Sequence, residues 1–315
     1  MKTAATIAPP APALADPRCA AGAASWAGFG GKAAALLELT KPRISVLVLV
    51  TVAVGFLLGA RGAAQPWALG LALLGTGLIG SGASAWNQYL ERDRDRWMKR
   101  TAGRPLPSGR VAPAEAALFG TALAVLGLIA LALGPHPVAA AVALATFGLY
   151  AFIYTPLKPR TTLNTVVGAV PGALPPVIGW TAATGALGIE AVALFLILFL
   201  WQFPHFLAIA WIYREDYSRA GYQMLPTIDP QGAQTGRQAA RYALALIPVG
   251  VLPAAIGLAG PGYFAGALGL GMFYLVAAVR FWFEVSDAKA RSLLRASFLY
   301  LPAILLWLLL NPPPA

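Results

Sequence analysis

The chain has 315 residues, of which 58% are hydrophobic and only 11% are charged. This balance excludes an ordinary soluble globular domain and is typical of a protein that crosses a membrane several times. The formal net charge of +11 does not indicate nucleic-acid binding, because the basic residues are spread over short segments between apolar runs. The single cysteine, Cys19, excludes an intrachain disulfide and a thiolate metal site.

Residues 1–35 are rich in Ala, Pro and Gly and contain no apolar run long enough to cross a bilayer. We predict a mostly disordered tail here, followed by one membrane domain over residues 36–315. No apolar segment stands behind a basic start, so a secretory signal peptide is not expected. A mitochondrial transit peptide is weakly supported, because Arg18 is the only arginine of the tail and Asp16 is also present.

Nine apolar segments follow the tail, each close to the ~20 residues that a membrane-spanning helix needs. We expect helices because the runs are continuous and because backbone polar groups in lipid must be satisfied within their own segment. The sequence therefore predicts an all-α polytopic membrane protein with nine transmembrane helices. They lie near residues 43–60, 67–90, 113–133, 137–156, 163–183, 189–212, 238–258, 262–282 and 291–310.

The distribution of charge predicts the orientation of these helices. The tail and the segments after the second, fourth, sixth and eighth helices, with their helix edges, hold 22 of the 23 Lys and Arg residues; Arg61 alone lies on the other side. Basic loops stay in the cytoplasm, so we expect a cytoplasmic N-terminus and a C-terminus outside. The long polar loops lie on the cytoplasmic side, which favours an active site at that face of a bacterial inner membrane over a mitochondrial one.

Two of the predicted helices carry residues that affect packing. Small residues in the second helix permit close helix contacts; they are Gly75, Gly77, Gly80, Gly82 and Ala83. Prolines should break up the fifth helix and kink the sixth; they are Pro171, Pro175, Pro176 and Pro204. Broken helices can line a cavity, although they can equally serve packing.

Three oxygen-bearing side chains are spaced four residues apart at the end of the second helix. Asn87, Glu91 and Asp95 fall on one stripe of a helix, whereas Asp93 points elsewhere. Two carboxylates and an amide oxygen at a helix end suit Mg²⁺, which completes its shell with water and substrate phosphates. The many basic residues around them would attract a polyanion. The simpler interpretation is a solvated cytoplasmic loop.

A second acidic pair, Glu215 and Asp216, follows the sixth helix on the same predicted side. An exposed ion pair with Arg214 or Arg219 is the simpler interpretation of this pair and contributes at most ~1 kcal/mol. His205 precedes Asp216 by eleven residues. If both residues belonged to one continuous helix, His205 would lie on nearly the same helix face as Asp216 and roughly 16 Å deeper in the membrane.

The pattern Asn87-x-x-x-Glu91-x-x-x-Asp95, followed by Arg100-Thr101 and Arg104-Pro105-Leu106, resembles the first aspartate-rich motif of the UbiA-type intramembrane prenyltransferase superfamily. Within it, four passages resemble the protoheme IX farnesyltransferase (heme O synthase) branch, and the likeness runs from about residue 36 to 310. The passages lie at 39–44, 154–158, 171–180 and 204–221. Two departures are Glu91, where the superfamily more often has Asp, and the reduced second acidic motif, which puts a second metal ion in doubt.

The resemblance implies an enzyme that transfers the farnesyl group of farnesyl diphosphate to the vinyl group of heme b, with addition of water, to give heme O. It implies Mg²⁺ as cofactor, held by Asn87, Glu91, Asp95 and Asp216. The candidates for binding diphosphate, heme propionates or the rest of the substrates are Lys41, Arg43, Arg100, Arg104, Tyr154, Lys158, Asn164 and Arg214, with Lys158 also a catalytic candidate.

Further partners follow from this resemblance. They are the lipid bilayer and a downstream heme A synthase or oxidase assembly factor, with no nucleic acid. His205 is expected to contact heme, because neutral imidazole is a common iron ligand; the alternative is a hydrogen bond to a neighbouring helix. Two other functions stay open: prenylation of a quinone precursor or other aromatic acceptor, and transport. The acids gather at one predicted membrane surface, away from the midplane, which argues against transport.

Overall fold

The computed structural model describes residues 29–63 and 65–313, and these residues form helices and connecting loops without a strand. Nine helical segments of this part are long and apolar enough to cross a membrane, which confirms the predicted number. They are α3 (Pro42–Ala60), α4 (Pro66–Asp95), α5 (Pro113–Ala132), Val138–Leu157, Asn164–Thr184, α10 (Ile189–Ile212), α13 (Ala233–Ala255), α14 (Pro261–Phe283) and α15 (Asp287–Leu310).

Proline begins several of these helices, because the first helical residue needs no backbone N–H. The helices that start this way are α3, α4, α5 and α14. Helix α4 continues through Asp95, so the predicted oxygen-bearing residues are helical.

Two of the membrane-spanning segments are irregular. Asn164–Thr184 is divided into α8 (Asn164–Ala173) and α9 (Pro175–Thr184), as the prolines predicted. Val138–Leu157 consists of α6 (Val138–Gly148), a π-helical segment, η2 (Leu149–Tyr154), and the short α7 (Thr155–Leu157). Pro204 lies inside α10, which runs through it without a break.

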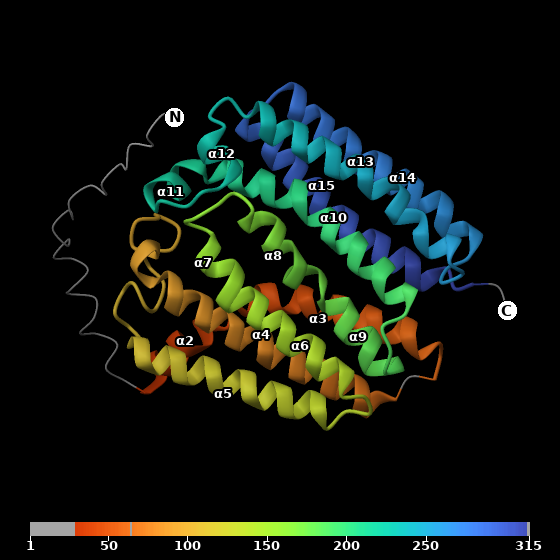
Figure 1. The fold of residues 1–315 in the computed structure, drawn as a ribbon, viewed down its shortest axis with the longest axis horizontal. Helices are drawn as coiled ribbons and strands as arrows, with labels where there is room; N and C mark the ends of the chain where they lie inside the picture. The colour runs from red at the N-terminus through yellow and green to blue at the C-terminus, as the bar shows by residue number, and fades with distance from the viewer. Residues whose placement is uncertain (1–28, 64, 314–315) are drawn as a thin grey trace, which may run out of the picture.

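The helices form two groups around a central region (Figure 1). Buried side chains of α10, α13, α14 and α15 make one hydrophobic core, and those of α3, α4, α6 and α9 make another. Glycines allow α4, in the second group, to approach α5 closely: a Cβ on Gly82 would lie 2.5 Å from the carbonyl oxygen of Gly120, and one on Gly127 would lie 2.6 Å from that of Gly75. Of the small residues predicted to permit close contacts, Gly75 and Gly82 pack against α5, whereas Gly77, Gly80 and Ala83 line a cavity.

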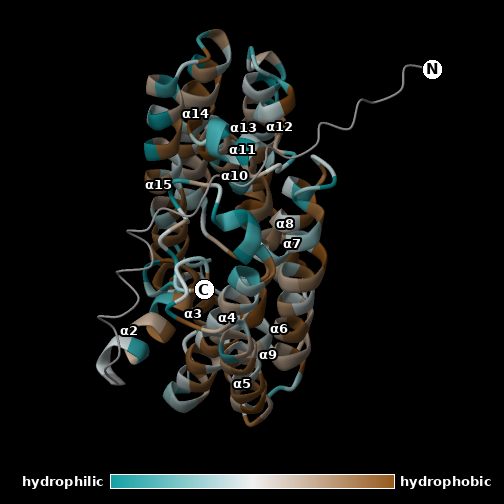
Figure 2. Cartoon of the chain, turned by 90° about the vertical axis from the view of Figure 1, so that its left-hand side faces the viewer, coloured by the Kyte–Doolittle hydropathy of each residue, from teal (hydrophilic) through white to brown (hydrophobic). Residues whose placement is uncertain are grey.

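The polar connections gather at one end of the molecule, where α4 and α7 end and the short helices α11 (Arg214–Arg219) and α12 (Leu225–Ile228) lie (Figure 1). Figure 2 looks onto this end and shows hydrophilic residues on α11 and nearby loops, while the long helices are mostly hydrophobic along their sides.

Two expectations need correction. Helix α2 begins at Phe29 and ends at Leu39, so the part of the predicted tail over residues 29–35 is helical; residues 1–28 lie outside the described part of the chain. Buried Ala35 and Leu39 and an ion pair between Lys32 and Glu115 attach α2 to α5 and its neighbours. The second correction concerns α10, which ends at Ile212 before α11 starts at Arg214. His205 and Asp216 therefore do not share one continuous helix.

Candidate active site

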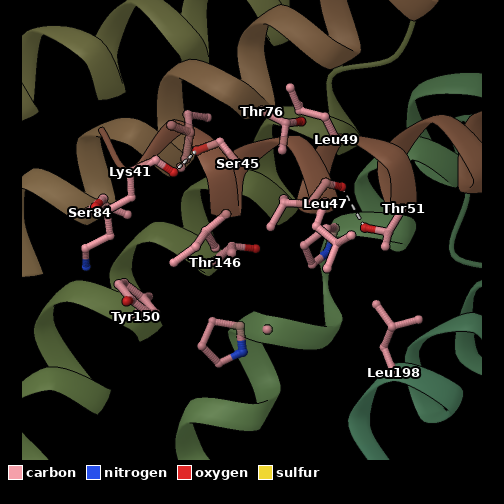
Figure 3. Close-up of a pocket in the computed structure, with 18 of the residues that line it drawn as sticks. Lys41, Ser45, Leu47, Leu49, Thr51, Thr76, Ser84, Thr146, Tyr150 and Leu198 are labelled. Carbon is pink, nitrogen blue, oxygen red and sulfur yellow. Dashed lines mark hydrogen bonds between the residues drawn. The ribbon is translucent and has the colours of Figure 1, made fainter. Parts of the chain in front are cut away.

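A cavity of about 410 Å³ lies in the central region, between α3, α4, η2, α8 and α10, with one residue of α15 at its wall. Its volume is in the range of ligand pockets, and its lining is mostly apolar. Figure 3 shows Lys41, Ser84 and Tyr150 toward one end and Leu49, Thr76 and Leu198 toward the other. The site is thus a long apolar chamber with a polar end.

The oxygen stripe, defined as Asn87, Glu91 and Asp95, lies on α4 beside this polar end. All three residues are buried, with exposed fractions of 2%, 5% and 0%. The Asp93 side chain, by contrast, is 72% exposed. The four-residue spacing therefore places three oxygen donors on the inner face of α4 and the intervening acid outside.

Each side chain of the oxygen stripe is matched by a cation from another segment. Lys41 Nζ donates to Asn87 Oδ1 at 3.2 Å, and Lys158 Nζ donates to Glu91 Oε1 at 2.5 Å. Arg104 Nη1 donates to Asp95 Oδ2 at 2.7 Å and lies 4.0 Å from Glu91 Oε2. The structure therefore brings six of the predicted site residues into one cluster of three cations and three oxygen-bearing groups.

Burial and mutual repulsion act differently on the two lysines of this cluster. Burial, and then the neighbouring Arg104, lower the pKa of Lys41 to about 7. Burial alone would also lower the pKa of Lys158, but the Glu91 carboxylate and Tyr154 together raise it well above the usual value for lysine. Lys158 therefore stays protonated, as Arg104 of the same cluster does.

The backbone of Lys41 is unusual. It lies in the left-handed region, with φ 50° and ψ 59°, between the end of α2 and Pro42. Side chains other than glycine rarely adopt this conformation, which costs roughly 1–2 kcal/mol. A strained backbone persists only where the surrounding structure stabilises it, often at functional sites. At Lys41 this conformation accompanies the contact between its ammonium group and Asn87.

The oxygen stripe has the chemistry of a site for a hard cation. Asp95 Oδ1 is buried and has no hydrogen-bond partner among the described residues, which is costly unless a ligand satisfies it. Within this same part of the chain no three His, Cys, Asp or Glu side chains stand close enough to hold an ion by themselves. Asn87, water and substrate phosphate would have to complete the shell, as is usual for Mg²⁺.

The loop after α10 closes over the polar end. Arg94 Nη1 donates to the carbonyl oxygen of Ala220 at 3.0 Å, and the backbone N–H of Gln223 donates to the carbonyl oxygen of Lys158 at 2.8 Å. The buried Asn164 donates through Nδ2 to the Gln223 carbonyl oxygen at 2.8 Å. Asn164 thus holds this loop against α8, beside the Lys158 backbone.

Four of the predicted charged residues lie outside the cluster. Asp216 forms an ion pair with Arg219, and Arg214 donates to Asp287 Oδ1 at 2.8 Å. Arg43 and Arg100 are exposed, and the guanidinium carbon of Arg100 lies 5.1 Å from the centroid of the Tyr213 ring. Over the described residues, none of these four side chains makes a polar contact with the oxygen stripe.

His205 lines the cavity from α10 and is 8% exposed. Its Nδ1 lies 2.8 Å from Ser297 Oγ, and the single proton of that hydroxyl is donated to the Leu294 carbonyl oxygen at 2.6 Å. When that hydroxyl donates to Leu294, Nδ1 carries the imidazole proton and Nε2 keeps its lone pair. The ring stacks on Trp201 with 5.0 Å between centroids, so its orientation is fixed from two sides.

Three contributing residues were not predicted from the sequence. Thr155 Oγ1 accepts from Asn87 Nδ2 at 3.2 Å, Thr101 Oγ1 donates to the backbone oxygen of Asp95 at 2.9 Å, and Ser297 orients His205. A single hydroxyl residue in an apolar helix forms no sequence pattern that predicts a functional role. Two of the three had a signal, since Thr101 lies in the Arg100-Thr101 pair of the first motif and Thr155 in the passage 154–158. Tyr154, which was predicted, lies with its ring centroid 4.7 Å from Lys158 Nζ.

Comparisons with solved structures identify the same fold. A structure of digeranylgeranylglyceryl phosphate synthase superposes with a TM-score of 0.73 at 19% identity, covering 89% of this chain and 98% of that one. A UbiA homolog from Archaeoglobus fulgidus bound to GPP and Mg²⁺ superposes with a TM-score of 0.62 at 18% identity, covering 87% and 99% of the two chains.

Sequence comparison gives a much stronger likeness. The protoheme IX farnesyltransferase of Solibacter usitatus is 48% identical over 287 residues, which cover 88% of this chain and 98% of that protein. Residues 48–306 match the model of the UbiA prenyltransferase family. With this match, and with nine helices among the described residues that are long and apolar enough to cross a membrane, the chain is an integral multi-pass membrane protein and a prenyltransferase that belongs to the UbiA prenyltransferase family.

Proposed function

We propose that the protein transfers the farnesyl group of farnesyl diphosphate to a vinyl group of heme b, with addition of water, and so makes heme O and pyrophosphate. The observation that carries this proposal is the oxygen stripe with its three cations at the polar end of a long apolar cavity. A prenyl diphosphate has the same division into a polyanionic head and an apolar chain. The acceptor is inferred from relatives such as the Solibacter usitatus protein, which is named protoheme IX farnesyltransferase.

The cations at the polar end would bind the diphosphate. Lys158 and Arg104 are held by carboxylates in the structure, and Lys41 by an amide oxygen. Breaking the allylic carbon–oxygen bond leaves negative charge on the pyrophosphate, and preorganised cations stabilise such developing charge. Arg43 and Arg100 stay candidates for heme propionates or for longer-range attraction, because their side chains are exposed at the same end of the molecule.

The oxygen stripe would hold Mg²⁺ together with the diphosphate. The orphaned Asp95 Oδ1 supports this assignment, and the homolog from Archaeoglobus fulgidus was solved with GPP and Mg²⁺. When bound, the ion neutralises the leaving group. We keep Asp216 as a further metal ligand that would have to leave its pair with Arg219.

The apolar part of the cavity would hold the farnesyl chain and keep bulk water from the first carbocation. Tyr150 and Tyr154, which are four residues apart on η2, both line it. Their rings lie next to the diphosphate end and can stabilise an allylic cation through their faces.

The heme would lie against α10 with His205 Nε2 toward it. The hydrogen bond through Ser297 supports this proposal, because it leaves Nε2 as the free, unprotonated nitrogen of a buried imidazole. Unprotonated imidazole nitrogen is a common ligand of heme iron. Arg214 and Asn164 would act indirectly, through the loop and helix ends that they hold.

We further propose the bacterial inner membrane as the location, with the N-terminus and the active site on the cytoplasmic side and the C-terminus outside. The charge bias of the connecting segments supports this orientation, and the 48% identical relative comes from the bacterium Solibacter usitatus. A heme A synthase or an oxidase assembly factor would be the downstream partner that takes the apolar product from the bilayer.

A reaction with purified protein tests the function. Protein in detergent is given heme b, farnesyl diphosphate and Mg²⁺, and the pigment is analysed by mass spectrometry while pyrophosphate is measured. We expect heme O and one pyrophosphate per product. A parallel reaction with 4-hydroxybenzoate in place of heme b tests the quinone-precursor alternative. Prenylation of that acceptor, without any product from heme b, would overturn the proposed acceptor.

A further inference from the structure

Two hydroxyl groups on α4 differ from the other serine and threonine hydroxyls around the cavity. Ser84 and Thr76 line it, are 6% and 4% exposed, and make no side-chain hydrogen bond with any described residue. The other serine and threonine hydroxyls of the lining donate to backbone carbonyls, as Thr51 does to Val48 at 2.7 Å and Thr146 to Val142 at 2.8 Å. A buried hydroxyl without a partner is costly, so Ser84 and Thr76 are candidates for contact with a polar ligand.

Of these two residues, Ser84 is the one near the polar end of the cavity. It lies three residues before Asn87 on α4, so the two side chains are neighbours on the helix surface, about 4.5 Å apart along the axis. Figure 3 shows Ser84 at the same end of the cavity as Lys41 and Tyr150. Thr76 lies eight residues before Ser84, roughly 12 Å further along the helix, where it would face only the prenyl chain.

The helix also leaves open space one turn before Ser84, and the Ser84 oxygen, which is covered by protein here, must turn to reach it. Gly80 lies one turn before Ser84 and also lines the cavity, and a Cβ built on it would meet nothing within 4 Å. A buried water needs such a space and two to four polar partners. Ser84 Oγ can supply one of them, as donor or acceptor.

We propose that Ser84 positions the water molecule that completes the reaction. This proposal rests on the proposed function, in which the farnesyl carbon–oxygen bond breaks and the π electrons of the heme vinyl group form the new carbon–carbon bond. The positive charge then lies on the vinyl carbon next to the ring. A lone pair of the water bound to Ser84 forms the carbon–oxygen bond, and the proton of the resulting oxonium passes to an oxygen of the pyrophosphate beside Asn87.

The apolar lining gives this residue its importance. Because bulk water is excluded from the cavity, a cation formed there loses a proton to give a diene unless one water is held in place. Ser84 therefore decides between two products that share every earlier step: heme O, and a farnesylated heme lighter by the mass of one water.

Ser84→Ala tests the proposal in the reaction with heme b and farnesyl diphosphate. The variant should still release pyrophosphate, while the ratio of the dehydrated product to heme O rises on the order of tenfold, as expected for loss of one positioned hydrogen bond. Ser84→Thr, which keeps a hydroxyl, should restore the wild-type ratio. Thr76→Val is the matched control, because it removes the other unpartnered hydroxyl of α4 and should leave the ratio unchanged.

Three results would overturn the proposal. The first is an unchanged product ratio in folded Ser84→Ala. The second is loss of pyrophosphate release in both Ser84→Ala and Ser84→Gly, because a residue that acts only after the carbon–carbon bond has formed leaves diphosphate cleavage intact. The third is wild-type protein that transfers no farnesyl group to heme b, which would overturn the proposed function as well, whereas the first two results leave that function standing.

Discussion

Replacing Asp95 by asparagine tests the role of the oxygen stripe most directly. Asparagine keeps the size of the side chain and an oxygen that can accept from Arg104, whose Nη1 lies 2.7 Å from Asp95 Oδ2. The change removes the negative charge and alters the partnerless Oδ1. We expect turnover to fall by about 10²–10³-fold, or about 2.7–4 kcal/mol, which is the usual effect of removing one preorganised electrostatic group.

The protein should nevertheless stay folded. The Asp95 and Arg104 side chains are 0% and 18% exposed, and losing one partner of a buried ion pair costs about 3–5 kcal/mol. Since asparagine retains the hydrogen bond, the cost should not exceed the lower end of that range. The assay is pyrophosphate release as a function of Mg²⁺ concentration, with thermal unfolding in the same detergent. The Mg²⁺ concentration for half-maximal rate should rise in the variant.

Asp93→Asn is the matched control, because Asp93 lies two residues away and its side chain is 72% exposed. Its turnover and Mg²⁺ dependence should stay close to those of the wild type. The reasoning would be refuted if both variants lost activity equally, or if Asp95→Asn turned over at the wild-type rate.

Three further predictions concern other parts of the molecule. Lys158→Met leaves Glu91 buried without its cation at 2.5 Å, so it should destabilise the protein by about 3 kcal/mol and abolish turnover; an unchanged melting temperature would contradict the buried pair. His205→Ala should raise the KM for heme b far more than that for farnesyl diphosphate and shift the Soret band of bound heme, and an unaltered spectrum would make His205 structural. Single cysteines at Gly103 and His136, with the native cysteine replaced by serine, should label only from the cytoplasmic and outer sides respectively; outside labelling of position 103 would refute the orientation.

Features that depend on local geometry were predictable from the sequence. The spacing of Asn87, Glu91 and Asp95 is a property of one helix, and the helix does continue to Asp95. The nine apolar runs and the break before Pro175 are equally local. Helix geometry alone therefore predicted which acid of this motif, Asp93, would lie outside.

Features that depend on packing were not predictable. Neither glycine nor proline marks the end of α10 at Ile212. The sequence therefore contained no sign that His205 and Asp216 lie on two different helices. The π-helical segment has no sequence signal either. Ser84 and Ser297 are ordinary serines in apolar runs, and their roles arise from what faces them: an open cavity in one case and a histidine of another helix in the other.

The glycine contacts between α4 and α5 have a consequence for genetics. Gly82 and Gly127 have no space for even a methyl group, since a Cβ would lie within 2.6 Å of a backbone oxygen or closer. Any replacement must push α4 away from α5, and α4 carries the oxygen stripe and Ser84. In a saturation screen scored by respiratory growth, these glycines should therefore tolerate as few substitutions as Asp95. Substitutions at these positions would be scored as catalytic defects, although the defect is a displaced helix.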